Sequence, residues 1–481
     1  MKFYKYFRSV GDTLYVVESD NGVDREYTKE VKPTLYVEGH EEFKTIYGRS
    51  LQPRQFDSIT LARQFADSSH GVYGFDRFAY SDIAKNYSNE YDQTQIKVGY
   101  IDIENAVVDR FPDIETADTP INCVTIGHKD VYYCFTTLDF KSEDYPKSYR
   151  VMKVQSEANL LDKVLRLWQH FSFDIISGWN CGGYDMPYLA KRIEVVLGKS
   201  YMNKLSKFNN VRITKSVDDN RTNFSCVILG TTILDMMDLY KKYVLTPRES
   251  YRLGFITQEE LKETKLELEG SFYETYTNHP SKFVLYNIID TELVAKLEKK
   301  LSLISLAINI AYTSKTNYDD CLSPVLVWDA IISDYLLAQN IIVPYRKNSG
   351  GGSGYEGAYV KDPIRGFYEW AVSFDFESLY PRLIQTLNIS PETMIAKDTW
   401  SPIRPSDIVE KTPHFDAARE IAVKYDATLC GNGAMFSKKN VGFIPVLAEM
   451  MFNKRKDAKN SMLKYKKSKE LVEAELKARG L

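Results

Sequence analysis

The sequence predicts a multidomain protein of mixed α and β structure, with an α/β pattern in its largest part. The chain has 481 residues, which is too long for one hydrophobic core and fits two to four domains. Short strands with alternating apolar residues dominate the first 98 residues, and apolar strand segments alternate with amphipathic helix segments from Val98 onward. The composition agrees, since 44% hydrophobic and 26% charged residues are typical of a soluble globular protein.

An N-terminal domain rich in β-strands is expected over residues 1–98. Strands are predicted around Thr13–Val17 and Thr34–Val37, and the sequence Asp20-Asn-Gly provides turn residues after the first of them. Residues 301–348, whose apolar spacing is largely helical, are expected to pack back on this domain.

A second domain is expected over residues 99–300. It opens with an apolar strand that ends in Asp102-Ile-Glu104, and helices are predicted over Glu157–Phe171 and Asp185–Leu197. The segment Ile213–Ile228 has a turn-rich centre and is expected to form a β-hairpin.

A third unit is expected after a flexible connector, Ser349-Gly-Gly-Gly-Ser-Gly. Its first part covers residues 349–440 and contains the strand-like segment Ala371–Phe376. Its last part covers residues 441–481, where one long helix is predicted over Pro445–Arg479.

Charge and cysteine content restrict the class of protein. The net charge of −3 disfavours a simple basic nucleic-acid binder, yet residues 438–481 carry 12 Lys and Arg but only 5 Asp and Glu. This basic segment suits local contact with phosphate, or a solvated helix face. The six cysteines form no C-x-x-C pair and the six histidines are scattered, so a catalytic metal must sit on carboxylates, which hard ions such as Mg²⁺ or Mn²⁺ prefer.

Carboxylates occur in motifs that are informative as a set. Asp102 and Glu104 are at i and i+2 of a strand and point to one face, where two close carboxylates favour a bound cation. Asp185 follows Asn180-Cys-Gly-Gly-Tyr184 between a strand and a helix start, and in isolation a helix cap explains it equally well.

Tyr286 and Asp290 form the third motif, at i and i+4 of a predicted helix, so the tyrosine hydroxyl can lie beside the carboxylate. In this order, D-x-E, N-x-x-x-[FY]-D and Y-x-x-x-D are similar to the motifs of DEDDy-type exonucleases. The resemblance implies that two metal ions are held by four acids: Asp102, Glu104, Asp185 and Asp290. It also implies that Tyr286 positions the attacking water. Asn180 of the second motif is expected to contact DNA.

The string Ser373-Phe-Asp-Phe-Glu-Ser-Leu-Tyr-Pro381 is the most specific in the chain. It resembles motif A of family B DNA polymerases, D-x-x-S-L-Y-P, and the continuation Leu387–Thr393 is most similar to the replicative polymerases of T-even-type tailed phages. The resemblance implies metal binding by Asp375 and the carbonyl of Phe376. It implies nucleotide binding by Ser378, Leu379 and Tyr380, with the Tyr380 ring excluding a 2′-hydroxyl. Arg382 stands where the family usually has Ser.

Two weaker strings agree with this resemblance. Tyr355-Glu-Gly357-Ala is similar to the family's Y-x-G-G/A motif, and DNA contacts are expected at Tyr355 and Gly357. Arg455 and Lys459 are i and i+4 on the last predicted helix, and they match a pair that the family's fingers domain presents to the triphosphate. Ordinary helix-surface charge is the alternative for this pair.

The resemblance covers essentially the whole chain but about the first half of the family's length. The family's fingers motif K-x-x-x-N-x-x-Y-G and palm motif D-T-D are not found in this sequence. The resemblance implies a ribonuclease-H-like 3′→5′ exonuclease domain over 99–300, the first part of a palm over 349–440 and an incomplete first fingers helix over 441–481. The predicted hairpin would help to move the primer strand toward proofreading.

The expected function is that of the N-terminal part of a DNA-directed DNA polymerase with a proofreading exonuclease. The polymerase site would be completed by a C-terminal chain with the rest of the fingers, palm and thumb, as in a split polymerase. Two Mg²⁺ ions per site are expected, with Mn²⁺ as a substitute. Expected partners are primer–template DNA, a single-stranded 3′ end, dNTPs, and a sliding clamp through the C-terminal chain. The sequence shows no signal peptide or membrane-spanning run. The resemblance to phage enzymes implies the cytoplasm of an infected bacterium as the location.

Two other functions stay open at this point. The first is a stand-alone exonuclease with a remnant polymerase region, which the intact string around Asp375 disfavours. The second is a non-catalytic nucleic-acid-binding regulator, which the complete set of exonuclease acids disfavours. Alanine at Asp102 and Glu104 separates an enzyme from a binder, because a binder would keep its activity.

Overall fold

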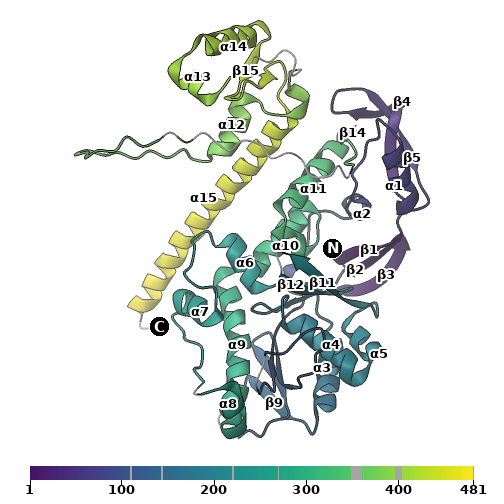
Figure 1. Ribbon diagram of the computed structural model, residues 1–481, viewed down its shortest axis with the longest axis vertical. Coiled ribbons are helices and arrows are strands. Elements are labelled where there is room, and N and C mark those ends of the chain that lie inside the picture. The colour runs from purple at the N-terminus through teal and green to yellow at the C-terminus, as the bar shows by residue number, and fades with distance from the viewer. Residues whose placement is uncertain are drawn as a thin grey trace. The chain divides into compact units, whose positions relative to one another are not determined.

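The computed structural model describes residues 1–108, 111–141, 145–218, 221–268, 270–347, 360, 362–395 and 403–479 (Figure 1). The chain divides into two compact units. The first contains Met1–Thr45 and Ser50–Lys347, and the second contains Ile46–Arg49 and Asn348–Leu481. Among the described residues, no helix is both long and apolar enough to cross a bilayer.

Two small sheets form the N-terminal part of the first unit. One has the antiparallel order β1 (Lys2–Val10), β2 (Thr13–Asp20), β3 (Val23–Glu30), and the other has the order β14 (Ile341–Ile342), β4 (Thr34–Thr45), β5 (Ser50–Gln55). The turn between β2 and β3 has φ 51° at Asn21 and 86° at Gly22, the left-handed backbone that these two residues tolerate. The strands and turn predicted here are confirmed. Helices α1 (Ile59–Ser68) and α2 (Phe78–Asn86) also belong to this region, which the alternating pattern did not predict.

Helices that follow in the sequence pack on these first strands. These are α10 (Leu303–Ser314), the 3₁₀ turn η4 (Tyr318–Leu322) and α11 (Pro324–Leu337). The Tyr4 hydroxyl donates to the carbonyl oxygens of Thr316 at 2.8 Å and Ala311 at 3.1 Å. The Tyr312 ring stacks on Tyr91 with 4.1 Å between centroids. Strand β1 and helix α10 therefore share one core, together with α1 and α2.

The first unit also contains a six-stranded sheet. Its order is β13 (Thr232–Ile233), β10 (Ile175–Ser177), β6 (Val98–Asn105), β7 (Ile121–His128), β8 (Val131–Thr136), β9 (Tyr149–Lys153). Strand β7 is antiparallel to β6 and β8, whereas β10 is parallel to both β6 and β13.

Helices cover both faces of this sheet (Figure 1). On one face, α3 (Glu157–Phe171) and α4 (Asp185–Leu197) share a core with Ile101 and Ile103 of β6. On the other face, α9 (Pro280–Leu301) packs Val284 and Ile288 against the cysteines of β7 and β8. Helices α3 and α4 have the bounds that the sequence predicts.

Shorter elements complete the first unit. They are α5 (Lys199–Met202), α6 (Met236–Tyr243), α7 (Leu253–Leu261), α8 (Phe272–Asn278) and the antiparallel pair β11 (Val211–Asp218) and β12 (Arg221–Ile228). This pair confirms the predicted hairpin.

The second unit is mainly helical in its described part. It contains α12 (Leu379–Leu387), α13 (Pro405–Glu410), α14 (Pro413–Lys424), α15 (Phe443–Ala478) and the hairpin of β15 (Ala427–Leu429) and β16 (Met435–Ser437). Helix α15 confirms the long C-terminal helix. The strand predicted over Ala371–Phe376 is wrong, because this segment is irregular and exposed. A strand needs a neighbouring strand to pair with its backbone N–H and C=O groups. The two strands described in this unit, β15 and β16, pair with each other.

Candidate active site

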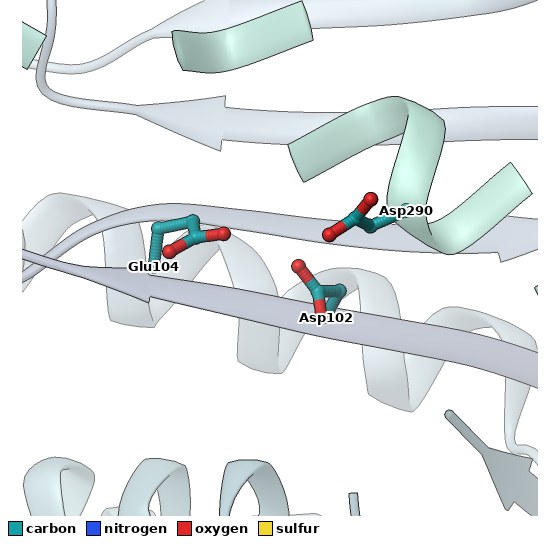
Figure 2. A group of neighbouring side chains, drawn as sticks. All are labelled: Asp102, Glu104 and Asp290. Carbon is teal, nitrogen blue, oxygen red and sulfur yellow. The ribbon is translucent and has the colours of Figure 1, made fainter. Parts of the chain in front are cut away.

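Three carboxylates converge where α9 crosses the centre of the six-stranded sheet. Asp102 and Glu104 come from β6 and Asp290 comes from α9, and one oxygen of each lies within 4.8 Å of the others. Figure 2 shows the three side chains turned toward one another. Three acidic oxygens this close form a set that could hold a metal ion.

The alternation of side chains between the two faces of β6 determines where these acids point. Ile101 and Ile103 are buried in the core with α3 and α4, so Asp102 and Glu104 project from the opposite face of β6. That face is covered by α9, which carries Asp290. The sequence spacing of one strand and one helix is therefore enough to bring these acids together once α9 docks.

Asp185, the fourth predicted acid, lies against the same strand. It is the first residue of α4, and its Oδ1 accepts a hydrogen bond from the backbone nitrogen of Ile103 at 3.1 Å. Ile103 lies between Asp102 and Glu104, so the structure brings Asp185 beside the three-carboxylate cluster, although it is not one of the three. The N-cap of α4 is Tyr184, and the described hydrogen bond of the Asp185 side chain goes to β6.

Burial and mutual repulsion control the protonation of these acids. Burial raises the pKa of Asp102 well above its usual range, and the charges of Asp185 and Glu104 raise it further. Burial, followed by the charge of Asp290, raises the pKa of Glu104 to about 8. Burial likewise raises the pKa of Asp185 to about 7, and that of Asp290 to about 6 against the opposing charge of Lys265. Without a cation the cluster therefore retains protons near neutral pH.

Lys265 is a site residue that the sequence analysis missed. Its ammonium pairs with the carboxylate of Asp290 and lies 4.1 Å from the centroid of the Tyr286 ring. Burial lowers the pKa of Lys265, but the charge of Asp290 outweighs it and raises that pKa above its ordinary value. Lys265 lies in an irregular segment after α7, and no local motif marks it.

Tyr286 and Asp290 occupy one face of α9, as their spacing predicts. Tyr286 is buried, and burial raises the pKa of its hydroxyl. One oxygen of Asp290, Oδ1, is buried without a hydrogen-bond partner among the described residues. An orphaned carboxylate oxygen beside two further acids is a donor set that fits a hard divalent cation.

Two buried residues support the acids from behind and were also missed. Asp235 accepts backbone hydrogen bonds from Asn180 and Gly182, in the loop that leads to Asp185. Asn287, next to Tyr286 on α9, donates to Asp102 Oδ2 at 2.6 Å. Asn180 itself has φ 63° and is exposed at the start of this loop.

The residues of the motif A string lie in the second unit. Asp375 and Phe376 are exposed in the irregular segment before α12, and Tyr380 is 77% exposed. The Arg455 guanidinium on α15 donates to the Ser378 hydroxyl at 3.2 Å, so the structure brings together two of the predicted nucleotide-binding residues.

The other residues of this unit that the sequence analysis named lie on α12 and α15 or outside the described residues. Leu379 begins α12, and Lys459 lies on the exposed surface of α15. Arg382, which replaces the family's usual Ser, lies 4.3 Å from the centroid of the Phe452 ring and so links α12 to α15. Tyr355, Gly357 and the predicted connector lie outside the described residues.

Two models of one protein family match this chain. Residues 58–256 match the exonuclease domain of DNA polymerase family B, and residues 329–477 match DNA polymerase family B itself. The chain belongs to DNA polymerase family B.

The chain is similar in sequence to individual DNA polymerases, two of them from phages. The chain is 29% identical, over 99% of its length, to the DNA-directed DNA polymerase of Escherichia phage RB69, and 30% identical, over 96%, to that of Enterobacteria phage T4. It is also 27% identical, over 65% of its length, to the DNA polymerase delta catalytic subunit of Caenorhabditis elegans. The matches cover 56% and 54% of the two phage proteins, so the chain spans about half the length of these relatives.

Proposed function

We propose that the first unit is a 3′→5′ exonuclease that proofreads DNA, and that the second unit contributes part of a DNA polymerase site. The observation that carries the proposal is the convergence of Asp102, Glu104 and Asp290 beside Asp185 and Tyr286. The sheet supports it, because the order β8-β7-β6-β10-β13, with only β7 reversed, is that of a ribonuclease-H-like fold. In this proposal residues 99–300 form the exonuclease domain.

The four acids would hold two Mg²⁺ ions, with Mn²⁺ as a substitute, and the ions would activate water and stabilise the leaving 3′-oxygen. The chain's own residues set the geometry. The Tyr286 hydroxyl orients the attacking water at the side of Asp290, and Lys265 holds the Asp290 carboxylate and the Tyr286 ring in place. Asn180, exposed at the start of its loop, contacts the DNA strand that carries the 3′ end.

For DNA synthesis, Asp375 and the carbonyl of Phe376 would bind metal, and Tyr380 would lie under the deoxyribose. Arg455 and Lys459 would contact the triphosphate, and the hydrogen bond from Arg455 to Ser378 supports a shared site for these two strings. The D-T-D motif is not found in this sequence. Synthesis would therefore require a second metal-binding aspartate from a further polypeptide segment, and contact with a sliding clamp would be made through that segment.

The test is a primer assay with a 5′-labelled primer annealed to a longer template, Mg²⁺ and all four dNTPs. The purified chain should shorten the primer, and removal of Mg²⁺ should stop the shortening. The double variant Asp102→Ala/Glu104→Ala should abolish it, whereas Asp139→Ala, at a carboxylate that is 85% exposed, should not. Primer lengthening by this chain alone would refute the need for a further segment. Primer shortening that survives the double variant would refute the exonuclease assignment.

A further inference from the structure

Asn287 lies at the back of the acid cluster, and every polar atom of its side chain is engaged on the site side of the sheet. The residue is fully buried on α9. Its amide nitrogen donates to Asp102 Oδ2 at 2.6 Å. Its amide oxygen accepts from the Thr125 hydroxyl at 2.5 Å and from the Cys123 thiol at 3.3 Å.

The strand register explains why these groups meet. Thr125 of β7 is the ladder partner of Asp102, and Cys123 is the ladder partner of Glu104. Residues opposite each other in a ladder present their side chains on one face, about 5 Å apart at Cβ. Asn287 lies across this face and bridges Asp102 to its own cross-strand neighbour.

When Asp102 is ionised, as it is when it binds a metal, its acceptor oxygens permit only one orientation of the Asn287 amide. An ionised carboxylate accepts hydrogen bonds and donates none, so the amide nitrogen must face Asp102. The amide oxygen then faces Thr125 and Cys123, which can both donate. The Thr125 hydroxyl donates to that oxygen and so stabilises the amide orientation that serves the ionised form of Asp102.

We propose that Asn287, oriented by Thr125, is a positioning residue that holds the Asp102 carboxylate in the geometry required for metal binding. The inference rests on the proposed metal site and adds to it a support that does not touch the ion. Partners behind a metal ligand fix the orientation of that ligand, and their loss typically costs about 10- to 100-fold in metal affinity or activity.

The test compares Thr125→Val with Thr125→Ser in the full chain. Valine keeps the shape of threonine but removes the hydroxyl, whereas serine keeps the hydroxyl. Binding of Mn²⁺ to the DNA-free protein is measured by electron paramagnetic resonance, and the Mg²⁺ dependence of primer shortening is measured in parallel. We expect Thr125→Val and Asn287→Leu to weaken Mn²⁺ binding and raise the half-saturating Mg²⁺ concentration by about 10-fold or more. Thr125→Ser should stay close to the parent protein.

Asn122→Leu is a matched control for Asn287→Leu. Asn122 is a buried asparagine of β7, the strand of Thr125, and its amide atoms have no hydrogen-bond partner among the described residues. It should leave Mn²⁺ affinity unchanged. Thermal melting identifies a variant that fails to fold, and the Thr125 pair decides the question if Asn287→Leu does so.

The outcomes separate this inference from the proposed function. Unchanged Mn²⁺ affinity in Thr125→Val, equal losses in the valine and serine variants, or no Mn²⁺ binding by the parent protein would overturn the positioning role. Weakened Mn²⁺ binding in Thr125→Val, without any primer shortening by the parent protein, would support the positioning role and refute the exonuclease.

Discussion

Asp235 accepts a hydrogen bond at 3.0 Å from the backbone nitrogen of Asn180, and so anchors the loop that leads to Asp185. The other oxygen of Asp235 accepts from Gly182 at 2.8 Å, and Oδ1 also caps α6 through Met237 at 2.9 Å. Burial raises the pKa of Asp235 to about 6, against these backbone donors. One buried carboxylate thus fixes the approach of the loop to the acid cluster.

Asp235→Asn should weaken this anchor, because an amide nitrogen cannot accept a hydrogen bond in place of one carboxylate oxygen. We expect the free energy of unfolding to fall by about 1–3 kcal/mol, with lower exonuclease activity at saturating Mg²⁺. Chemical denaturation and primer shortening measure the two effects. Asp238→Asn, at an exposed acid of the same helix, is the control. Equal effects at both positions would argue against the anchor.

The stability of the metal-free protein should fall as the pH rises. The ordinary pKa is 3.8 for Asp, whereas the folded protein raises it to about 7 for Asp185 and to about 6 for Asp290. The ordinary value of 4.5 for Glu is raised to about 8 for Glu104. The folded state therefore binds more protons than the unfolded state between about pH 4 and 8, and its advantage is lost as the pH rises through the folded values.

In EDTA, the melting temperature should therefore decrease from about pH 6 to about pH 8, apart from the effects of other groups. Mg²⁺ should raise the melting temperature more at the higher pH, where the acids are ionised. The double variant Asp102→Asn/Glu104→Gln should show a weaker pH dependence and a smaller Mg²⁺ effect. If the parent and the variant have the same pH slope in EDTA, the cluster is not its source.

Lys265→Met should separate the effect of the Lys265 charge from that of its side-chain packing. Loss of the positive charge should raise the pKa of Asp290 and displace the Tyr286 ring, so exonuclease activity should decrease at neutral pH and recover partly at higher pH. The pH profile of primer shortening measures this. Lys296→Met is the control, because Lys296 pairs with Glu263 at the surface and is 37% exposed. A profile identical to that of the parent would exclude an electrostatic role for Lys265.

Asp174→Asn should destabilise the fold without touching the acid cluster. Asp174 is fully buried and pairs with Lys207 at 2.7 Å and Lys5 at 3.1 Å, both nearly buried. Removal of its charge breaks the ion pair of the nearly buried Lys207, and it leaves Lys5 with Asp24, at 2.7 Å, as its carboxylate partner. Breaking a buried pair in this way costs about 3–5 kcal/mol. Denaturant titration measures this cost. Asp139→Asn, in an exposed pair with Lys153, should change little.

The ion pairs of Asp174 with Lys207 and Lys5 also predict that the protein loses stability in acid. Burial acts to raise the pKa of Asp174, but the charges of Lys207 and Lys5 outweigh it and hold that pKa below the ordinary 3.8. Its contribution to stability is present above the unfolded value and is lost as the pH falls through the lower folded value. The parent protein should thus lose stability below about pH 4 more steeply than Asp174→Asn. Parallel acid-unfolding curves for the two proteins would contradict this.

Local sequence predicted α3 and α4, whose ends carry their own signals. Helix α3 begins after Ser156, whose side chain accepts from the backbone of Asn159, and α4 ends at Gly198 with φ 95°. The acids of β6 and α9 were predictable for a similar reason, because the periodicity of one strand and one helix fixes the face on which each side chain lies.

Residues whose role depends on tertiary contacts were not predictable. Lys265 reaches Asp290 from an irregular segment, and Asn287 reaches Asp102 from a position 185 residues away. The strand prediction over Ala371–Phe376 failed for the opposite reason. Its composition favours a strand, but strand formation depends on a neighbouring strand, which composition does not report.

The bond between the Tyr4 hydroxyl and the Thr316 carbonyl joins residues that lie 312 positions apart. During synthesis at about 5–20 residues per second, roughly 15–60 s separate the emergence of these two residues from the ribosome. The apolar face of β1 therefore stays partly uncovered until α10 has been synthesised. Nascent chains released before this point would expose that face, which makes β1 a target for chaperones and proteases.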